Sequence, residues 1–185
     1  MIDNPDRERW NSKYIQGFVG ETEPSELLVE FIPSVCVGRA LDVAAGFGRN
    51  SLFLAERSFI VDAVDISDIA IERLRSLHQN IIPIHADLAK FRPPPNMYDL
   101  IVNVNFLERN LFPYLIEALK IGGFLLFETF MVGSPSKTNK DFLLRKNELL
   151  HAFLNLRVMF YQEKRVINKN GEEAYKAYLV AKKEC

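Results

Sequence analysis

Three aspartates and two glycines are the residues of this chain whose types and spacing could do chemistry. Asp42 and Asp65 belong to apolar runs of strand type, Asp87 follows a third such run, and Gly46 and Gly48 separate the first run from a helix-like segment. Glycines remove the Cβ atoms that would keep a ligand away from the backbone, and the first turn of a helix offers unpaired N–H groups. Strand, Gly-x-Gly, helix and a second strand that ends in Asp, in this order, predict the nucleoside site of a doubly wound sheet.

The elements that must position these residues alternate along the chain, and this alternation indicates a parallel sheet with helices on both faces. We expect strands at residues 39–45, 59–64, 81–85, 100–104 and 124–130, and helices at residues 25–31, 50–57, 68–77, 111–120 and 146–153. The last strand-like runs, 156–167 and 174–181, are joined through Asn170-Gly171, a dipeptide typical of hairpins. The prediction is an α/β fold: one doubly wound, Rossmann-like domain whose seven-stranded mixed sheet finishes in an antiparallel hairpin.

Length and composition indicate a single globular domain, with residues 25–185 as its core and residues 1–24 as an N-terminal extension or lid. A net charge of -1 and a pI near 6.3 give no overall attraction to nucleic acid or anionic lipid, so neither is an expected partner. The start of the chain has no apolar leader, and no run reaches the roughly 20 apolar residues of a membrane helix. Two cysteines form no metal or disulfide framework, so we expect a cytoplasmic protein without a metal site. The expected oligomeric state is a monomer or a homodimer.

The side chains around the second and third acid suit an adenosine. Asp65 follows the second strand, where the hydroxyls of a ribose would arrive, and Asp87 could accept a hydrogen bond from an exocyclic adenine amine. Ile66 and Leu88, the residues that follow these acids, could pack on the two faces of the base. Any one of the acids is as readily explained by a turn, since Asp is common at strand ends, but all three together point to a ligand.

In these residues the chain resembles the class I S-adenosylmethionine-dependent methyltransferases. The resemblance rests on the acid and glycine loop of residues 42–48, on the later acids Asp65 and Asp87, on the stretches 98–107 and 119–128, and on the terminal hairpin. It implies the class I methyltransferase fold and S-adenosylmethionine as the cofactor. The residues implied to bind that cofactor are Asp42, Ala44, Gly46, Gly48, Asn50, Asp65, Ile66, Asp87, Leu88 and Asn103.

A narrower resemblance, carried by residues 48–55 and by Trp10 with Tyr14, is to the small tellurite-resistance and thiopurine-type methyltransferases. It implies a small-molecule acceptor, whether a thiol, a chalcogen anion or a heterocycle. A methyltransferase acting on protein or RNA, and a non-catalytic module that binds the cofactor, are the alternatives. An NAD-dependent dehydrogenase shares the two glycines, but the third position of the dinucleotide fingerprint is not glycine or alanine here.

Methyl transfer from a sulfonium needs a nucleophile held in line with the S–CH₃ bond and shielded from water, so no catalytic triad or metal is required. Glu128 is the candidate general base because it ends a predicted buried strand; its structural alternative is an ion pair with Arg109 or Arg145. The residues expected to contact the acceptor, or to form a lid over it, are Trp10, Tyr14, Asn105, Phe106 and Arg109. The loop of residues 133–139 is polar enough that we expect it to be mobile or to cover the substrate.

Overall fold

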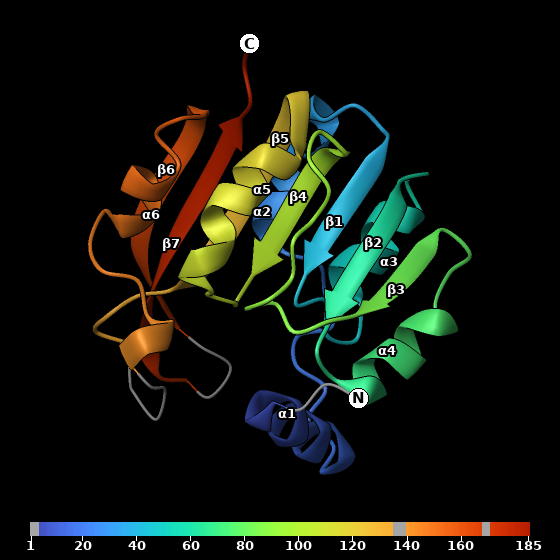
Figure 1. Ribbon diagram of the computed structural model, residues 1–185. Helices are drawn as coiled ribbons and strands as arrows, with labels where there is room; N and C mark the ends of the chain where they lie inside the picture. The colour runs from blue at the N-terminus through green and yellow to red at the C-terminus, as the bar shows by residue number, and fades with distance from the viewer. Residues whose placement is uncertain (1–3, 135–139, 168–170) are drawn as a thin grey trace.

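A seven-stranded sheet in the order β3-β2-β1-β4-β5-β7-β6 runs through the centre of the protein (Figure 1). This computed structural model describes residues 4–134, 140–167 and 171–185. The strands are β1 (Arg39–Val43), β2 (Ile60–Asp65), β3 (Ile81–His85), β4 (Tyr98–Val104), β5 (Leu119–Phe130), β6 (Arg157–Ile167) and β7 (Glu173–Lys182). β1 to β5 are parallel, and β7 is antiparallel to both of its neighbours, β5 and β6. The predicted α/β fold with a terminal antiparallel pair is confirmed; Asn170 of the expected turn lies outside the described residues.

Helices cover both faces of the sheet. They are α1 (Pro5–Ile15), α2 (Glu26–Phe31), α3 (Arg49–Ala55), α4 (Asp68–Arg75), α5 (Phe112–Ala118) and α6 (Glu148–Ala152), with short 3₁₀ turns η1 (Ile32–Ser34), η2 (Arg109–Leu111) and η3 (Lys140–Phe142). α5 and α6 lie in front of the sheet in Figure 1, and α2 and α3 lie behind it. Each face has its own apolar core: Leu115 and Leu149 belong to the front core, and Leu28 and Leu54 to the other.

The observed boundaries of three elements differ from the predicted ones because of the local backbone conformation. β1 stops at Val43 rather than at residue 45, because Ala44 already has a φ of 55° and the chain turns into the glycine loop. The last helix begins at Glu148 because Asn147, just before it, adopts a φ of 59°. β5 starts five residues earlier than predicted, at Leu119, because the Gly122-Gly123 pair is accommodated within the strand.

The N-terminal helix α1 lies beyond the carboxyl ends of β1, β2 and β3 and packs on α4 (Figure 1). Asn11 donates a hydrogen bond to Asp68 at 2.8 Å and accepts one from the Ser67 hydroxyl at 2.6 Å, and Arg7 forms an ion pair with Asp68 at 2.6 Å. No residue of α1 is buried, so these polar contacts, rather than an apolar core, fix its position. Trp10 and Tyr14 share one face of this helix, as their spacing predicts.

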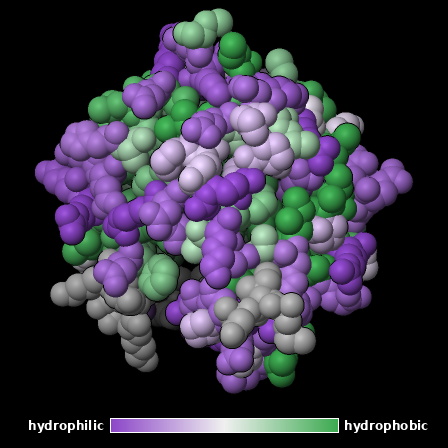
Figure 2. Space-filling model, in the orientation of Figure 1, coloured by the Kyte–Doolittle hydropathy of each residue, from purple (hydrophilic) through white to green (hydrophobic). Residues whose placement is uncertain are grey.

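Among the described helices, none is both long and apolar enough to cross a membrane. On the face seen in Figure 2, polar and apolar side chains are interspersed, with polar ones covering most of the area.

Candidate functional site

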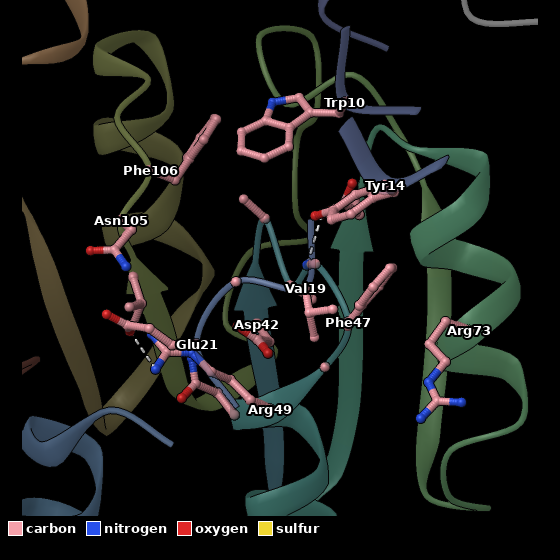
Figure 3. A pocket seen from close by; sticks show the side chains of 18 of the residues that line it. Trp10, Tyr14, Val19, Glu21, Asp42, Phe47, Arg49, Arg73, Asn105 and Phe106 are labelled. Carbon is pink, nitrogen blue, oxygen red and sulfur yellow. Dashed lines mark hydrogen bonds and ion pairs between the residues drawn. The ribbon is translucent and has the colours of Figure 1, made fainter. Parts of the chain in front are cut away.

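A cavity of about 380 Å³ lies at the carboxyl ends of β1, β2 and β4, between the glycine loop and α1 (Figure 3). Of the residues predicted to bind a cofactor or an acceptor, those that line it are Trp10, Tyr14, Asp42, Ala44, Gly46, Gly48, Asn50, Asp65, Ile66, Leu88, Asn105 and Phe106. Asp87, Asn103, Arg109 and Glu128 do not line it. The parallel sheet brings the first group together because the carboxyl ends of its strands meet at one edge.

The glycine loop is built so that only glycine fits at its last position. Gly48 has a φ of 80°, and a Cβ atom there would lie 2.5 Å from Leu74 and 2.7 Å from Leu77. Gly46 has a φ of 55°, and a Cβ atom there would meet the hydroxyl of Tyr14 at 3.1 Å. The loop therefore passes close under α4 and α1, and its bare backbone forms the floor of the cavity.

Asp65 ties the glycine loop to the end of β2. One oxygen of its carboxylate accepts the Gly46 N–H at 2.8 Å and the other accepts the Ser67 N–H at 2.9 Å. Burial raises the pKa of Asp65 above its usual value, although these backbone bonds act in the opposite direction. A carboxylate can accept about four hydrogen bonds, so Asp65 can still accept one from a hydroxyl of a ribose besides those of the backbone.

Asp42 lies inside β1, with its side chain buried beneath the glycine loop. Its carboxylate accepts a hydrogen bond from the Ser51 hydroxyl at 2.6 Å. Burial raises the pKa of Asp42 to about 6, even though the Ser51 bond and the charge of Arg49 lower it. The carboxylate is thus a poorly solvated anion at neutral pH and favours a cationic group of a ligand beside it.

Asp87 is occupied by the N-terminal helix. Its carboxylate accepts the side-chain amide of Asn4, the N-cap of α1, at 2.9 Å and the backbone N–H of Ala89 at 3.0 Å. Its neighbour Leu88 does reach the cavity. Asp87 thus lies next to the expected adenine position, but it is bonded to the start of the N-terminal helix and does not line the open cavity.

Aromatic side chains line the end of the cavity where the predicted acceptor-binding residues lie. Trp10, from α1, and Phe106, from the loop after β4, lie opposite each other there (Figure 3). Tyr14 stacks on Phe47 of the glycine loop, with ring centroids 4.4 Å apart. Asn103 is buried and supports this end from below, since its amide donates a hydrogen bond to the Phe106 carbonyl at 2.8 Å.

Arg109 is not brought to the cavity. Its guanidinium forms a bidentate pair with Glu148, at 2.6 and 3.1 Å, and donates to the Leu143 carbonyl at 3.0 Å. This pairing lowers the pKa of Glu148, chiefly through the hydrogen bond from Arg109. Arg109 therefore joins η2 to α6. The position of Arg109 in the sequence, next to the expected acceptor loop, did not predict this contact between distant segments.

Glu128 lies near the end of β5, two residues before its last residue, and meets different partners from those expected. Neither Arg109 nor Arg145 pairs with it, which corrects that expectation; Lys176 of β7 does, at 3.2 Å, and the Ser25 hydroxyl donates to it at 2.8 Å. The carboxylate lines a second cavity of about 480 Å³, on the far side of the segment that leads from α1 to α2. β7 supplies Lys176 only because it is inserted beside β5, which the linear order of strands does not indicate.

Residues 1–24 were expected to form an extension or lid, but the sequence did not identify which residues between α1 and α2 form a wall of the cavity. Phe18, Val19 and Glu21 line it, and Glu21 forms an ion pair with Arg49 at 2.6 Å. The Arg49 guanidinium also donates to the Glu23 carbonyl at 2.6 Å. Phe18 continues the four-residue spacing of Trp10 and Tyr14, and this periodicity could have identified Phe18 as a residue that lines the cavity. Elsewhere, the described residues contain no group of three or more His, Cys, Asp or Glu side chains that could hold a metal ion.

Comparison with known proteins gives this geometry a family context. Residues 40–123, which contain the glycine loop, Asp65 and Asp87, match the family model of a methyltransferase domain. A search of curated proteins finds no match.

Solved structures with the same fold include TehB from Haemophilus influenzae (TM-score 0.73, 22% identity, 95% of this chain and 67% of that one). An S-adenosylmethionine-dependent methyltransferase from Mesorhizobium loti aligns with a TM-score of 0.70 and 19% identity, over 84% of this chain and 95% of that one. Phosphoethanolamine N-methyltransferase 2 from Haemonchus contortus, in complex with S-adenosyl-L-methionine, aligns with a TM-score of 0.69 and 16% identity, over 95% of this chain and 56% of that one.

The cavity fits such a cofactor on its own evidence. The cavity is lined by the backbone of the glycine loop, by the Asp65 carboxylate and by the buried Asp42 carboxylate. These three features suit, in turn, the glycosyl, hydroxyl and cationic groups of S-adenosylmethionine. Residues 40–123 thus match a methyltransferase domain, and the chain has the class I methyltransferase fold, which it shares with S-adenosylmethionine-dependent methyltransferases of known structure.

Proposed function

We propose that this protein transfers the methyl group of S-adenosylmethionine to a small-molecule acceptor by in-line displacement. The observation that carries the proposal is the continuity of the cavity, which runs from the glycine loop and Asp65 to the aromatic pair of Trp10 and Phe106. One hollow thus offers room for a nucleoside at one end and for a second, smaller molecule at the other.

The cofactor would be held by the residues that line the loop end of this cavity. Gly46 and Gly48 admit it to the backbone, Asp65 accepts from its ribose, and Ile66 and Leu88 pack on its base. Asp42, Ala44 and Asn50 complete this end, while Asp87 and Asn103 act from just outside the cavity. When bound, the cofactor supplies a methyl group already activated on a sulfonium.

The protein's own contribution is then to position the acceptor and to exclude water. α1 and the segment that follows it close the cavity over the glycine loop, which supports this shielding role. Holding two reactants in line can lower a barrier by about 7–11 kcal/mol. The proposal assigns no proton transfer to Glu128, which is bound to Lys176 and Ser25 and lies apart from this cavity.

Among thiols, chalcogen anions and heterocycles, the acceptor end favours an uncharged ring. The cations that line the cavity, among the described residues, are Arg49, which is paired with Glu21, and Arg73, which lies at the opposite end from Phe106 (Figure 3). Arg109 is committed to Glu148. A hydrated anion would lose its water shell here without gaining a cation, whereas a flat apolar ring would gain contacts with Trp10 and Phe106.

Membership of the small tellurite-resistance and thiopurine-type group, a cytoplasmic location and a monomeric or homodimeric state are parts of the same proposal. The group membership rests on the sequence features around Trp10, Tyr14 and residues 48–55, and the cytoplasmic location on two cysteines without a disulfide framework. A methyltransferase for protein or RNA is the second candidate, although the roofed cavity offers less room for a macromolecule. A non-catalytic module that only binds the cofactor is the third.

Calorimetric titration of the purified protein with S-adenosylmethionine, S-adenosylhomocysteine and NAD tests the cofactor part. Micromolar binding of the first two without NAD is expected, and binding of NAD alone would overturn the proposal. Transfer of a radiolabelled methyl group in a cell extract then separates the candidates. Label in small molecules supports the proposal, label removed by protease or RNase supports the second candidate, and binding without any transfer supports the third.

A further inference from the structure

Four buried polar residues form one hydrogen-bonded chain between the two cavities, and one of its links passes through a backbone N–H group. Lys176 of β7 donates to one oxygen of Glu128 at 3.2 Å, and the hydroxyl of Ser25 donates to the other at 2.8 Å. The backbone N–H of Ser25 in turn donates to the side-chain oxygen of Asn50 at 2.9 Å. Their exposed fractions are 7% for Lys176, 5% for Glu128, 4% for Ser25 and 5% for Asn50.

This chain ends on the cofactor cavity. Asn50 lies in the first turn of α3, directly after the glycine loop, and lines the cavity. Ser25 ends the segment from α1 to α2, whose residues Val19, Glu21 and Thr22 form another part of the wall. Ser25 is the N-cap of α2, but its hydroxyl makes no capping bond, because it is turned to Glu128 instead.

The two charges of this network form an ion pair with each other, with Lys176 Nζ 3.2 Å from Glu128 Oε1. A buried carboxylate and a buried ammonium are each costly alone, and Glu128 and Lys176 offset one another. The negative charge of Glu128 also helps to raise the pKa of Tyr178, after burial, which places the Tyr178 hydroxyl in the field of the same carboxylate. Among the described residues, the remaining oxygen of Glu128 has Ser25 as its partner, so the position of Ser25 follows that of the end of β5.

We propose that Glu128, held by Lys176, is a positioning residue for cofactor binding: through Ser25 it fixes Asn50 and the wall segment of residues 19–22. The inference rests on the proposed function, since it deepens the account of the same cavity. Glu128 does not touch the cofactor or the acceptor in this scheme. It acts at the junction where the wall segment enters α2, opposite the second clamp on that segment, the ion pair of Glu21 with Arg49.

Ser25→Ala is the sharpest test, because it removes the hydroxyl while leaving the Glu128–Lys176 pair and the backbone bond to Asn50 in place. We expect its Kd for S-adenosylhomocysteine and its KM for S-adenosylmethionine to rise at least about threefold, the effect of one modest hydrogen bond, with kcat unchanged. Ser25→Thr, which keeps the hydroxyl, should restore both constants. Ser34→Ala, an exposed serine in the following turn, is the matched control and should equal the wild type.

The double variant Glu128→Gln with Lys176→Met guards against simple unfolding, because it removes both buried charges together and keeps an acceptor oxygen for Ser25. Positioning predicts that any loss of activity in this variant appears in the Kd and KM for the cofactor, and that the pH profile keeps its shape. A large fall in kcat with an altered pH profile would instead identify Glu128 as a general base and overturn the inference. An unchanged Kd in Ser25→Ala would overturn it as well, whereas failure of the wild type to bind S-adenosylhomocysteine would overturn the proposed function itself.

Discussion

The side-chain amide of Asn4 donates a hydrogen bond to the carboxylate of Asp87 at 2.9 Å, across 83 positions of the chain. Asn4 is also the N-cap of α1, since its side-chain oxygen accepts the Asp6 N–H at 2.8 Å. Asn4 therefore caps α1, the helix that covers the cavity, and also attaches α1 to Asp87, the residue predicted to bind the adenine.

Asn4→Ala should loosen α1, because it removes the cap and the bond to Asp87 together. Each contributes about 1 kcal/mol, so amide hydrogen exchange in residues 6–15 should accelerate about tenfold or more. Asn4→Ser keeps a capping oxygen but is too short to reach Asp87, and it should show an intermediate rate. Equal exchange in all three proteins would mean that the contact with Asp87 does not hold the helix.

Asp65→Asn should weaken cofactor binding while the fold remains. The carboxylate receives a backbone N–H on each oxygen, and an amide can accept only one of them, so the glycine loop loses an anchor and the ribose loses an acceptor. A lost charged hydrogen bond of about 1.5–3 kcal/mol corresponds to roughly a tenfold or greater rise in Kd. Titration calorimetry with S-adenosylhomocysteine measures the change. Glu72→Gln, an exposed acid on α4, should leave the Kd unaltered.

Asp42 should make the protein less stable as the pH rises from about 4 to about 6. Its pKa is raised from 3.8 to about 6 in the folded state, so the native protein keeps a proton there that the unfolded chain releases. Stability falls with pH wherever the native state binds more protons, and a pKa difference of about two corresponds to roughly 3 kcal/mol. The loss is complete about one pH unit above this pKa, near pH 7.

Urea unfolding of the wild type and of Asp42→Asn between pH 4 and 7.5 isolates this contribution, since other groups titrate alike in both proteins. The free energy of unfolding of the wild type should decline relative to that of the variant up to about pH 7 and then run parallel to it. A difference that is the same at every pH would show that Asp42 keeps an ordinary pKa.

The aromatic end of the cavity predicts a preference among acceptors. Benzyl mercaptan and cyclohexylmethanethiol differ mainly in the flatness of the ring, so kcat/KM should favour the first by about threefold to tenfold, as expected for an aromatic contact. Phe106→Leu should reduce this ratio towards one without changing the Kd of the cofactor. Phe53→Leu, on α3 and outside the cavity, serves as the control. A higher kcat/KM with selenite than with either thiol would contradict the preference. Trp10 is the single tryptophan of the chain, so its fluorescence reports directly on occupancy of this end.

The sequence by itself was sufficient for the sheet, the hairpin and the glycine loop. Their signals are local: alternation of apolar runs, two glycines before a helix, and an acid at the end of the next strand. The structure gathers Asp42, Gly46, Gly48 and Asp65 around one cavity because parallel strands carry their carboxyl ends to a common edge. Element boundaries were less accurate, as at β1, where the positive φ of Ala44 has no signal in its residue type.

The pairing of charged and polar side chains was decided only by the tertiary structure. Arg109 joins Glu148, Glu128 joins Lys176 and Ser25, and Asn4 joins Asp87, although each had several partners of suitable chemistry along the chain. Local periodicity says which residues face a core, but it does not say which distant segment arrives beside them. The insertion of β7 next to β5 and the path of residues 16–25 across the end of the sheet make those choices, because a hydrogen bond forms only between groups that the fold brings within about 3 Å.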